Sequence, residues 1–438
     1  MNTVGIIAEY NPFHTGHAYH IRKAKELTRS DCAVVIMSPD FVQRGEPAIF
    51  DKYARAEMAL RCGADLVIEL PVCYATGSAE YFARGAVTML DRLGAVDALC
   101  FGAETDSVQL FETVASLLCD EPQPYRESLR ESLRQGKTFP QARSDALCAV
   151  LTDRMAEAGL SEASAALSRF LETPNNILGI EYCKALRHLR SRMEIVPVAR
   201  RGNSYDSKSL SGSFCSATAL RETILDESEF LSDELLSDNT WARMKQYIPE
   251  ECWKQFRALC AFPMTSQELD SCLTLRLLDD AVTGSIRCEE TAILDLSSEL
   301  ADRMGKLRYE LAGKTYREAV ARLKTRQLTE ARIRRALLHL ILNIRTDDVK
   351  QYLENGTVFY ARVLGFRKSA APLLHEIKKR SVLPLITKTA NASFTPDGCA
   401  ARMWESDVYA SHLYRSIRQI KYNIPFRTEY EYSPVIIP

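Results

Sequence analysis

The sequence predicts an α/β fold: an open, mostly parallel sheet in the first part of the chain, followed by a mainly helical part. Over the first 200 residues, short apolar runs rich in Val and Ile alternate with longer stretches of helical periodicity. The runs last four to six residues and do not alternate polar with apolar positions, which is typical of strands buried on both faces of a parallel sheet. After about residue 228 this rhythm stops and helical periodicity prevails.

Five apolar runs in the first part are predicted to be strands, at residues 4–8, 32–37, 65–70, 98–101 and 195–198. Helical periodicity fills the intervals at residues 17–28, 52–62, 78–93 and 107–119. This order indicates parallel strands joined by right-handed crossovers. The polar, helix-rich stretch at about 120–172 is expected to be an insertion between the fourth and fifth strands.

The second part of the chain is predicted to consist mainly of helices. They are expected within residues 233–259, 266–278, 314–326, 329–343, 371–380 and 407–420, ahead of an extended tail at 425–438. The segments 314–326 and 329–343 are expected to pair, because the second carries a strong apolar stripe. A chain of 438 residues suffices for two or three domains. We expect a sheet-containing domain at residues 1–230 and a mainly helical, basic domain at 231–438.

The composition is that of an ordinary soluble globular protein, with 46% hydrophobic and 26% charged residues. No stretch approaches the roughly 20 apolar residues that a membrane span needs, and the first residues lack the pattern of a secretion signal. The 13 cysteines are scattered, with no C-x-x-C spacing and no Cys/His cluster. We therefore expect a cytoplasmic protein with no metal site built from cysteine or histidine.

The near-zero net charge conceals an asymmetry. Residues 301–438 carry 25 Lys and Arg against 13 Asp and Glu, a net charge of +12, and the remainder carries −13. A basic C-terminal third on an acidic body suggests a polyanionic partner. Charge alone leaves open the alternative of a solvated helix surface.

The first predicted strand leads directly into a motif with two histidines. An Asn11-Pro12 turn and Phe13 precede His14-Thr15-Gly16-His17, where a helix is expected to begin. Helix N-termini bind anions, and a glycine lets the backbone approach a phosphate without a Cβ. Both histidines can then donate to phosphate oxygens as negative charge builds up during displacement at phosphorus. The alternative is a pair of surface histidines at a helix cap, but the strand and turn before them favour catalytic His14 and His17.

A second motif, Ser216-Ala217-Thr218-Ala219-Leu220-Arg221, follows the last predicted strand of the sheet. Ser216 and Thr218 are suitable N-cap residues, and their hydroxyls can cradle another phosphate. Arg221 can hold a leaving pyrophosphate. A plain capped helix is the alternative; the pairing with the first motif favours a functional role.

These two motifs resemble the H-x-G-H and Ser-x-Thr-x-x-Arg signatures of the nucleotidyltransferase superfamily, whose members bind ATP at the head of a Rossmann-like sheet of the HUP type. Further blocks narrow the resemblance to the tRNA(Met) cytidine acetate ligase family, over nearly the whole chain. They lie at residues 38–48, 51–59, 101–104, 174–182, 200–202, 331–333 and 362–366. The sequence departs from the family at Ser38-Pro39-Asp40, where Ser-Gly-Asn is usual, and from the superfamily at Ala217, where Ser is usual. Because Pro39 lacks an N–H, any contact of that loop's backbone with ligand is in question.

The resemblance implies an ATP-dependent ligase. Members activate acetate as acetyl-adenylate and transfer the acetyl group to N4 of the wobble cytidine in elongator tRNA(Met). Mg²⁺ is expected to accompany ATP because it neutralises phosphate charge, although no dedicated carboxylate site stands out. With the second motif included, the expected ATP-binding residues are Gly5, Ile6, Ile7, Ala8, Glu9, Tyr10, Asn11, Pro12, Phe13, His14, Thr15, Gly16, His17, Ala18, Gly102, Asn175, Arg200, Ser216, Thr218 and Arg221.

The weaker candidates for the site are Glu9, from the stretch already named, and three further residues, Gln43, Arg44 and Lys52. The Arg44 side chain can bind the carboxylate of acetate, or it can form a salt bridge within its own loop. The basic C-terminal part offers a surface for tRNA phosphates. The expected tRNA-binding residues are Arg332, Arg335, Lys378, Lys379 and Arg380. Neighbouring aromatic residues are expected to stack on unpaired bases, namely Tyr352, Tyr360, Tyr409 and Tyr414.

Two other classes of function remain open at this point. A small-molecule adenylyltransferase would share the first domain but has no need of a large basic helical domain. A nucleotide-sensing protein without turnover would tolerate a degraded site, whereas both histidines and the second motif are intact here.

Overall fold

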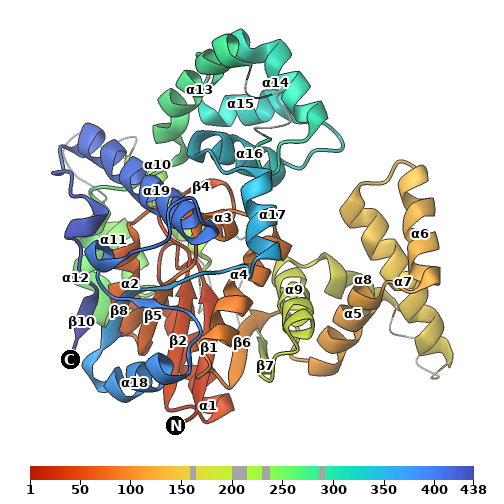
Figure 1. Ribbon diagram of the computed structural model, residues 1–438, viewed down its shortest axis with the longest axis horizontal. Coiled ribbons are helices and arrows are strands. Elements are labelled where there is room, and N and C mark those ends of the chain that lie inside the picture. Colours follow the sequence, from red (N-terminus) through yellow and green to blue (C-terminus); the bar gives the residue numbers. More distant parts are fainter. Residues whose placement is uncertain (158–163, 200–214, 229–236, 285, 287–291) are drawn as a thin grey trace.

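The computed structural model describes residues 1–157, 164–199, 215–228, 237–284, 286 and 292–438, and a single sheet runs through its centre (Figure 1). The strand order is β10-β8-β5-β2-β1-β6-β7, with β9 paired to β8. The strands are β1 (Thr3–Ala8), β2 (Cys32–Met37), β5 (Leu66–Glu69), β6 (Ala98–Ala103), β7 (Glu194–Ala199), β8 (Ala361–Arg367), β9 (Leu385–Ile386) and β10 (Val435–Ile437).

The five strands predicted in the first part of the chain are confirmed, and they pair in parallel. β1 lies between β2 and β6, β5 continues the sheet beyond β2, and β7 continues it beyond β6. Successive side chains of β2 point to opposite faces of the sheet. Val34 and Ile36 belong to one buried hydrophobic cluster, and Val35 belongs to the other. Burial on both faces explains why these strands read as continuous apolar runs.

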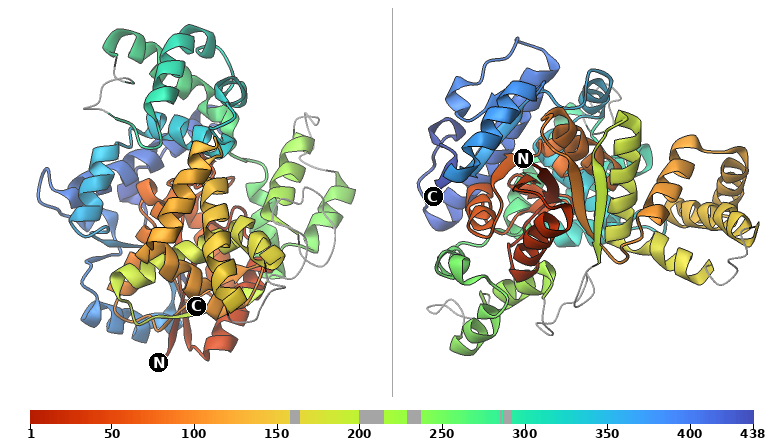
Figure 2. Two further views of the ribbon diagram at one scale, coloured as in Figure 1. Left: turned by 90° about the vertical axis from the view of Figure 1, so that its right-hand side faces the viewer. Right: turned by 90° about the horizontal axis from the view of Figure 1, so that it is seen from below.

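Helices cover both faces of the sheet (Figure 2). The cluster that contains Val35 is closed by α1 (Thr15–Thr28), α2 (Lys52–Arg61), α10 (Ala217–Ser228), α11 (Asp238–Lys245) and α12 (Glu250–Leu259). The opposite cluster is closed by α3 (Val72–Ala75), α4 (Ala79–Arg92), α5 (Val108–Asp120) and α9 (Pro174–Leu189), together with helices of the C-terminal part. Both motifs singled out in the sequence therefore open helices on the same face, α1 and α10.

The expected helical insertion between the fourth and fifth strands is confirmed. It comprises α6 (Gln123–Arg134), α7 (Phe139–Glu157) and α8 (Ser164–Glu172). Figures 1 and 2 show these helices projecting to one side of the sheet, beyond α5 and α9.

The C-terminal part is mainly helical, as predicted. Its helices are α13 (Asp270–Thr283), α14 (Ser298–Leu311), α15 (Tyr316–Leu323), α16 (Glu330–Leu342), α17 (Thr346–Glu354), α18 (Ala371–Arg380) and α19 (Cys399–Tyr422). Short 3-10 turns occur at η2 (Ser266–Leu269), η5 (Lys368–Ala370), η6 (Thr389–Asn391) and η7 (Glu429–Glu431). Among the described residues, no helix is both long enough and apolar enough to cross a membrane.

The C-terminal part also contributes strands to the central sheet, and the run that forms β8 was not predicted to be a strand. β8 pairs antiparallel with β5, and β10 pairs in parallel with β8, so the sheet crosses the boundary expected near residue 230. The run that forms β8, Ala-Arg-Val-Leu-Gly-Phe-Arg, is interrupted by arginine and glycine. Gly365 is needed because a Cβ there would lie 2.7 Å from the carbonyl oxygen of Val435 in β10.

A buried ion cluster fastens the end of the chain to this sheet. Lys52 Nζ lies 2.6 Å from a Glu69 carboxylate oxygen and 3.0 Å from one of Glu429, and all three side chains are at most 1% exposed. Arg362 of β8 pairs with both carboxylates, and Arg415 of α19 pairs with Glu429. Lys52, a weaker site candidate, is therefore a structural residue that joins α2, β5, and the C-terminal turn.

Candidate functional site

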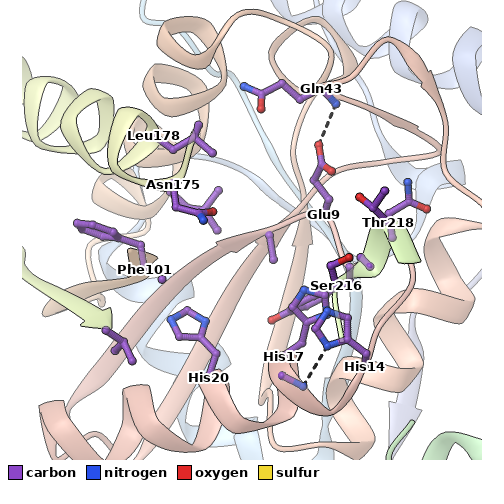
Figure 3. A pocket seen from close by; sticks show the side chains of 18 of the residues that line it. Glu9, His14, His17, His20, Gln43, Phe101, Asn175, Leu178, Ser216 and Thr218 are labelled. Carbon is purple, nitrogen blue, oxygen red and sulfur yellow. Dashed lines mark hydrogen bonds between the residues drawn. The ribbon is translucent and has the colours of Figure 1, made fainter. Parts of the chain in front are cut away.

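A pocket opens at the carboxyl ends of β1, β6 and β7, the edge of an open α/β sheet where ligands bind (Figure 3). Many of the expected ATP-binding residues line it, from segments more than 200 positions apart. They are Ile7, Ala8, Glu9, Tyr10, Asn11, His14, Gly16, His17, Gly102, Asn175, Ser216, Thr218 and Arg221. The remaining expected residues of the first stretch do not line the pocket: Gly5, Ile6, Pro12, Phe13, Thr15 and Ala18. Arg200 lies outside the described residues.

The turn between β1 and α1 is fixed from several sides. Tyr10 has a φ of 51°, the peptide bond from Asn11 to Pro12 is cis, and Asn11 Oδ1 accepts a 2.8 Å hydrogen bond from the backbone N–H of Ile49. At the start of α1, the backbone N–H of Thr15 donates to the carbonyl of Tyr247 at 2.8 Å. The helix start that carries both histidines is thus held against neighbouring segments.

His14 is the N-cap residue of α1. Its Nδ1 accepts a 3.0 Å hydrogen bond from the backbone N–H of Gly16, and its side chain is 5% exposed. The rings of His14 and His17 stack with their centroids 3.8 Å apart. Because Nδ1 acts as an acceptor, the proton of the neutral His14 ring is on Nε2. This ring can therefore cap the helix and donate to an anion with its other nitrogen.

The second motif meets the first one directly. Ser216 caps α10, with its Oγ accepting a 3.0 Å hydrogen bond from the N–H of Ala219. The Arg221 guanidinium donates to the backbone carbonyl of Asn11 and, at 3.3 Å, to Thr218 Oγ1. One arginine thus ties the start of α10 to the turn that precedes the histidines.

The opposite side of the pocket is less polar. Phe82, Phe101, Leu178 and Tyr182 line it, and such a surface suits the face of an adenine ring. Asn175 stands at its rim, and its amide donates to Glu104 Oε1 at 2.7 Å. One N–H of the Asn175 amide is thus held by Glu104 in this structure.

A small hairpin, β3 (Phe41–Val42) and β4 (Glu46–Pro47), brings two more side chains to the pocket. Gln43 and Arg44 lie in its turn and line the pocket, and Glu9 Oε1 accepts a 2.9 Å hydrogen bond from the N–H of Gln43. Burial raises the pKa of Glu9, while the neighbouring Arg221 and Arg44 oppose that rise. The two weaker candidates Gln43 and Arg44 therefore do belong to the pocket.

Pro39 does not line the pocket. Its carbonyl, like those of Glu9 and Ser38, accepts a hydrogen bond from the fully buried guanidinium of Arg55. These hydrogen bonds use only carbonyl oxygens of the loop. They therefore do not need the backbone N–H that proline lacks.

Several residues that line the pocket were not predicted. His20 is one of them, and it follows His17 by three positions on α1, a spacing that places both on one helix face. That spacing is a signal that the sequence did contain. Tyr182 and Phe82 come from α9 and α4, and only their tertiary packing brings them here.

The expected tRNA-binding residues fall into two separate groups. Arg335 forms a 2.8 Å ion pair with Asp295, and Arg332 Nε donates to the carbonyl of the same residue at 3.4 Å. The end of α18 exposes the side chains of Lys378, Lys379 and Arg380. Just beyond it, the backbone N–H of Val382 donates to the carbonyl of Arg92, a residue that precedes β6. Figure 1 shows α18 near the end of the sheet where β1 begins, whereas the pocket lies at the carboxyl ends of the strands.

The expectation that four tyrosines stack on RNA bases is wrong for three of them. Tyr352, Tyr360 and Tyr414 are at most 3% exposed and belong to the core, whereas Tyr409 is 43% exposed. As for metals, the described residues contain no group of three or more His, Cys, Asp or Glu side chains that would hold an ion.

Comparison with known proteins gives consistent matches along the chain. The model of the HIGH nucleotidyl transferase family matches residues 1–427. A tRNA(Met) cytidine acetate ligase from Thermoanaerobacter sp. (strain X514) is 37% identical over 414 residues, which cover 94% of this chain and 95% of that protein. A protein of the same name from Clostridium kluyveri is 34% identical over 438 residues, which cover 100% and 99%.

Two solved structures of Thermotoga maritima TmcAL cover 100% of both chains. The one bound with alpha-thio ATP has a TM-score of 0.84 at 29% identity, and the apo form I has a TM-score of 0.86 at 30% identity. An ATP analogue is thus bound by a protein of the same overall fold.

Proposed function

The chain belongs to the HIGH nucleotidyl transferase family, and on this basis we propose that it is an ATP-dependent tRNA(Met) cytidine acetate ligase. In the first half-reaction, an oxygen of acetate attacks the α-phosphorus of ATP and pyrophosphate leaves. In the second, N4 of the wobble cytidine of elongator tRNA(Met) attacks the acetyl carbon, AMP leaves, and N4 loses a proton. The products are N4-acetylcytidine, AMP and pyrophosphate.

The observation that carries this proposal is the junction of the two motifs. Arg221 donates to the carbonyl of Asn11, so the helix starts that carry His14 and Ser216 face one pocket. Two helix N-termini directed at one cavity, with histidine, hydroxyl and guanidinium donors around them, form a site for a chain of phosphates. Donors set in place before the reaction stabilise the charge that develops on the α-phosphate.

The pocket also supplies room for the base and for acetate. We place the adenine against the apolar side near Phe101 and Leu178, with Gly102 and Asn175 beside it. The α-phosphate then lies by His14 and His17, and the pyrophosphate lies by Ser216, Thr218 and Arg221. Acetate would enter on the side of Arg44, whose guanidinium can hold its carboxylate.

We expect Mg²⁺ to arrive bound to the phosphates of ATP. A hard cation takes oxygen ligands, and the phosphates provide them, whereas the described residues contain no cluster that would hold the ion on its own. Its role would be to neutralise phosphate charge. With a tRNA as its substrate, the protein would work in the cytoplasm.

The test is acetate-dependent isotope exchange. The purified protein is incubated with ATP, Mg²⁺, acetate and labelled pyrophosphate, and label is expected to enter ATP only when acetate is present. Transfer is then followed by mass spectrometry of nucleosides from tRNA(Met). Exchange that depends on a nucleotide or another small molecule in place of acetate would support the alternative, a small-molecule adenylyltransferase.

A further inference from the structure

Transfer of the acetyl group, as proposed above, requires a group that accepts the proton of cytidine N4. The exocyclic amine is neutral and weakly nucleophilic, so a positioned base accelerates its attack. Among the described residues that line the pocket, the candidates for accepting this proton are the imidazoles of His14, His17 and His20 and the carboxylate of Glu9.

The three histidines are less well placed for this task. His14 uses Nδ1 to accept from the N–H of Gly16, and it stacks on His17 beside the phosphate-binding helix start. His20 lies toward Phe101 and Asn175, on the side that we assign to adenine (Figure 3), with its Nε2 3.5 Å from Cys100 Sγ.

Glu9 carries the only carboxylate among the described lining residues. Figure 3 shows it between the histidines and Gln43, on the side away from Phe101. Its Oε1 is held by the N–H of Gln43, and its backbone carbonyl is held by the buried guanidinium of Arg55. One carboxylate oxygen and the backbone carbonyl of Glu9 are thus both held in place, as suits a group that must act in one geometry.

A carboxylate beside a site for ATP, a polyanion, needs an explanation, because like charges repel. Arg221 of α10 and Arg44 of the hairpin face Glu9 and favour its charged form, whereas Glu46 of the same hairpin opposes it. Burial outweighs these charges and raises the pKa of Glu9. A carboxylate with a raised pKa is a stronger base than an exposed one.

We propose that Glu9 is the general base of acetyl transfer. As the bond between N4 and the acetyl carbon forms, the bond from that carbon to the phosphate oxygen of AMP breaks, and the proton of N4 moves to the Glu9 carboxylate. The proton passes to solvent once the products have left. This role rests on the proposed function and assigns one step of it.

The decisive variant is Glu9→Gln. A glutamine oxygen still accepts the hydrogen bond from Gln43, but the amide takes up no proton. Two rates are measured: acetate-dependent pyrophosphate exchange, and single-turnover transfer from enzyme-bound acetyl-adenylate to tRNA(Met). We expect the ratio of transfer to exchange to fall by about 10²-fold or more, the usual effect of losing a general base.

His20→Gln is the matched control, because it removes another proton acceptor from the same pocket; its ratio should stay close to that of the wild-type protein. In the wild-type protein, transfer should slow as the pH falls through the pKa of Glu9, because the protonated carboxyl accepts no proton. This acidic limb should vanish in Glu9→Gln.

An unchanged ratio in Glu9→Gln, with exchange and transfer intact in the wild-type protein, would overturn the role of Glu9 alone. An equal loss of both rates that raised Mg²⁺ restores would make Glu9 a metal ligand instead. A fall in the ratio for His20→Gln and not for Glu9→Gln would move the role to His20. A wild-type protein without acetate-dependent exchange would overturn the proposed function and this role with it.

Discussion

The two ring nitrogens of His14 have different roles in the proposed site. Nδ1 accepts from the N–H of Gly16 and so begins α1, while Nε2 carries the proton that a phosphate oxygen would accept. The residue therefore couples the local folding of the helix start to the chemistry proposed for it. Side-chain substitutions can separate these two contributions.

Replacing His14 by Ala should lower acetate-dependent exchange by about 10²-fold, because one donor to the transition state is lost. It should also lower the free energy of unfolding by about 1 kcal/mol, because the N-cap is lost. His14→Asn restores an N-cap acceptor, so stability should return in denaturant titration while exchange stays low. Near-wild-type exchange in His17→Ala would contradict the assignment of the histidines to phosphate.

The buried Asp407 of α19 should make the stability of the protein depend on pH. Its carboxylate accepts hydrogen bonds from the N–H of Val72 and from Tyr360 Oη, and burial, with Glu69 nearby, raises its pKa to about 7. The folded protein therefore holds a proton there that the unfolded chain releases above pH 4. The stability that this proton provides is complete at acidic pH and is lost as the pH rises through 7.

Asp407→Asn should remove that loss. Relative to the wild-type protein, the free energy of unfolding of the variant should increase by about 3 kcal/mol between pH 5 and pH 8. The measurement is denaturant unfolding at several pH values, with Asp347→Asn as the control because Asp347 is exposed and pairs with the exposed Lys350. A difference between the proteins that stays constant with pH would contradict the raised pKa.

The helices α15 and α16 do more than pack in the hydrophobic core. They also hold in place the hairpin that carries Gln43 and Arg44. Tyr316 Oη of α15 lies 2.9 Å from the carbonyl oxygen of Gly45 and 2.6 Å from that of Arg334. Gly45 has a φ of +76°, and a Cβ there would lie 2.5 Å from backbone atoms of Arg334 and Arg335. The helical part thus positions one wall of the pocket.

Gly45→Ala should accordingly damage both stability and activity. Gly136→Ala is the matched control, because Gly136 has a φ of +78° but a Cβ there would meet no described atom within 4 Å. In both variants the alanine must adopt a left-handed backbone conformation, which lowers the free energy of unfolding. Gly45→Ala should lower it by about 1–3 kcal/mol more, because the new Cβ overlaps with α16. It should also slow acetate-dependent exchange. Equal unfolding midpoints for the two variants would show that the hairpin can shift away from α16 at no cost in stability, and would contradict this prediction.

The elements that the sequence predicted well are those with a local signal. β2 is apolar over its whole length and β1 nearly so, and each of the two motifs proposed to bind phosphates combines residues only a few positions apart. β8 was missed because Arg362 and Gly365 interrupt it. The ion partners of Arg362, Glu69 and Glu429, lie far from it in the sequence. The hairpin wall of the pocket was only weakly indicated, because its place depends on contacts with α15 and α16.

For the whole molecule, the +12 charge of residues 301–438 overstates the surface available to RNA. Several of these basic side chains are paired within the fold: Arg362 and Arg415 with Glu429, Arg418 with Asp51, and Lys421 with Glu268. Part of the excess therefore balances the acidic body and fastens the chain end to the sheet. The cations outside such ion pairs remain available to tRNA phosphates.

The placement of the two basic groups changes what we expect of each. Arg332 belongs to α16, which packs on the hairpin at the pocket, whereas Lys378, Lys379 and Arg380 end α18 at the opposite edge of the sheet. A tRNA that places its wobble cytidine in the pocket would lie on the side of the molecule where α16 packs on the hairpin. The second group lies at the opposite end of the sheet, so we expect it to contribute less to tRNA binding than the first.

Arg332→Glu should weaken tRNA(Met) binding and reduce the slope of log affinity against log salt by about one, the effect of one lost phosphate contact. Reversal of Lys378, Lys379 and Arg380 together should change affinity and slope much less. Binding is measured by filter retention at several salt concentrations. Acetate-dependent exchange should persist in both variants, because the first half-reaction needs no RNA. If the triple reversal abolished binding while Arg332→Glu retained it, the tRNA would run along the far edge of the sheet, and the anticodon loop would have to reach the pocket from there.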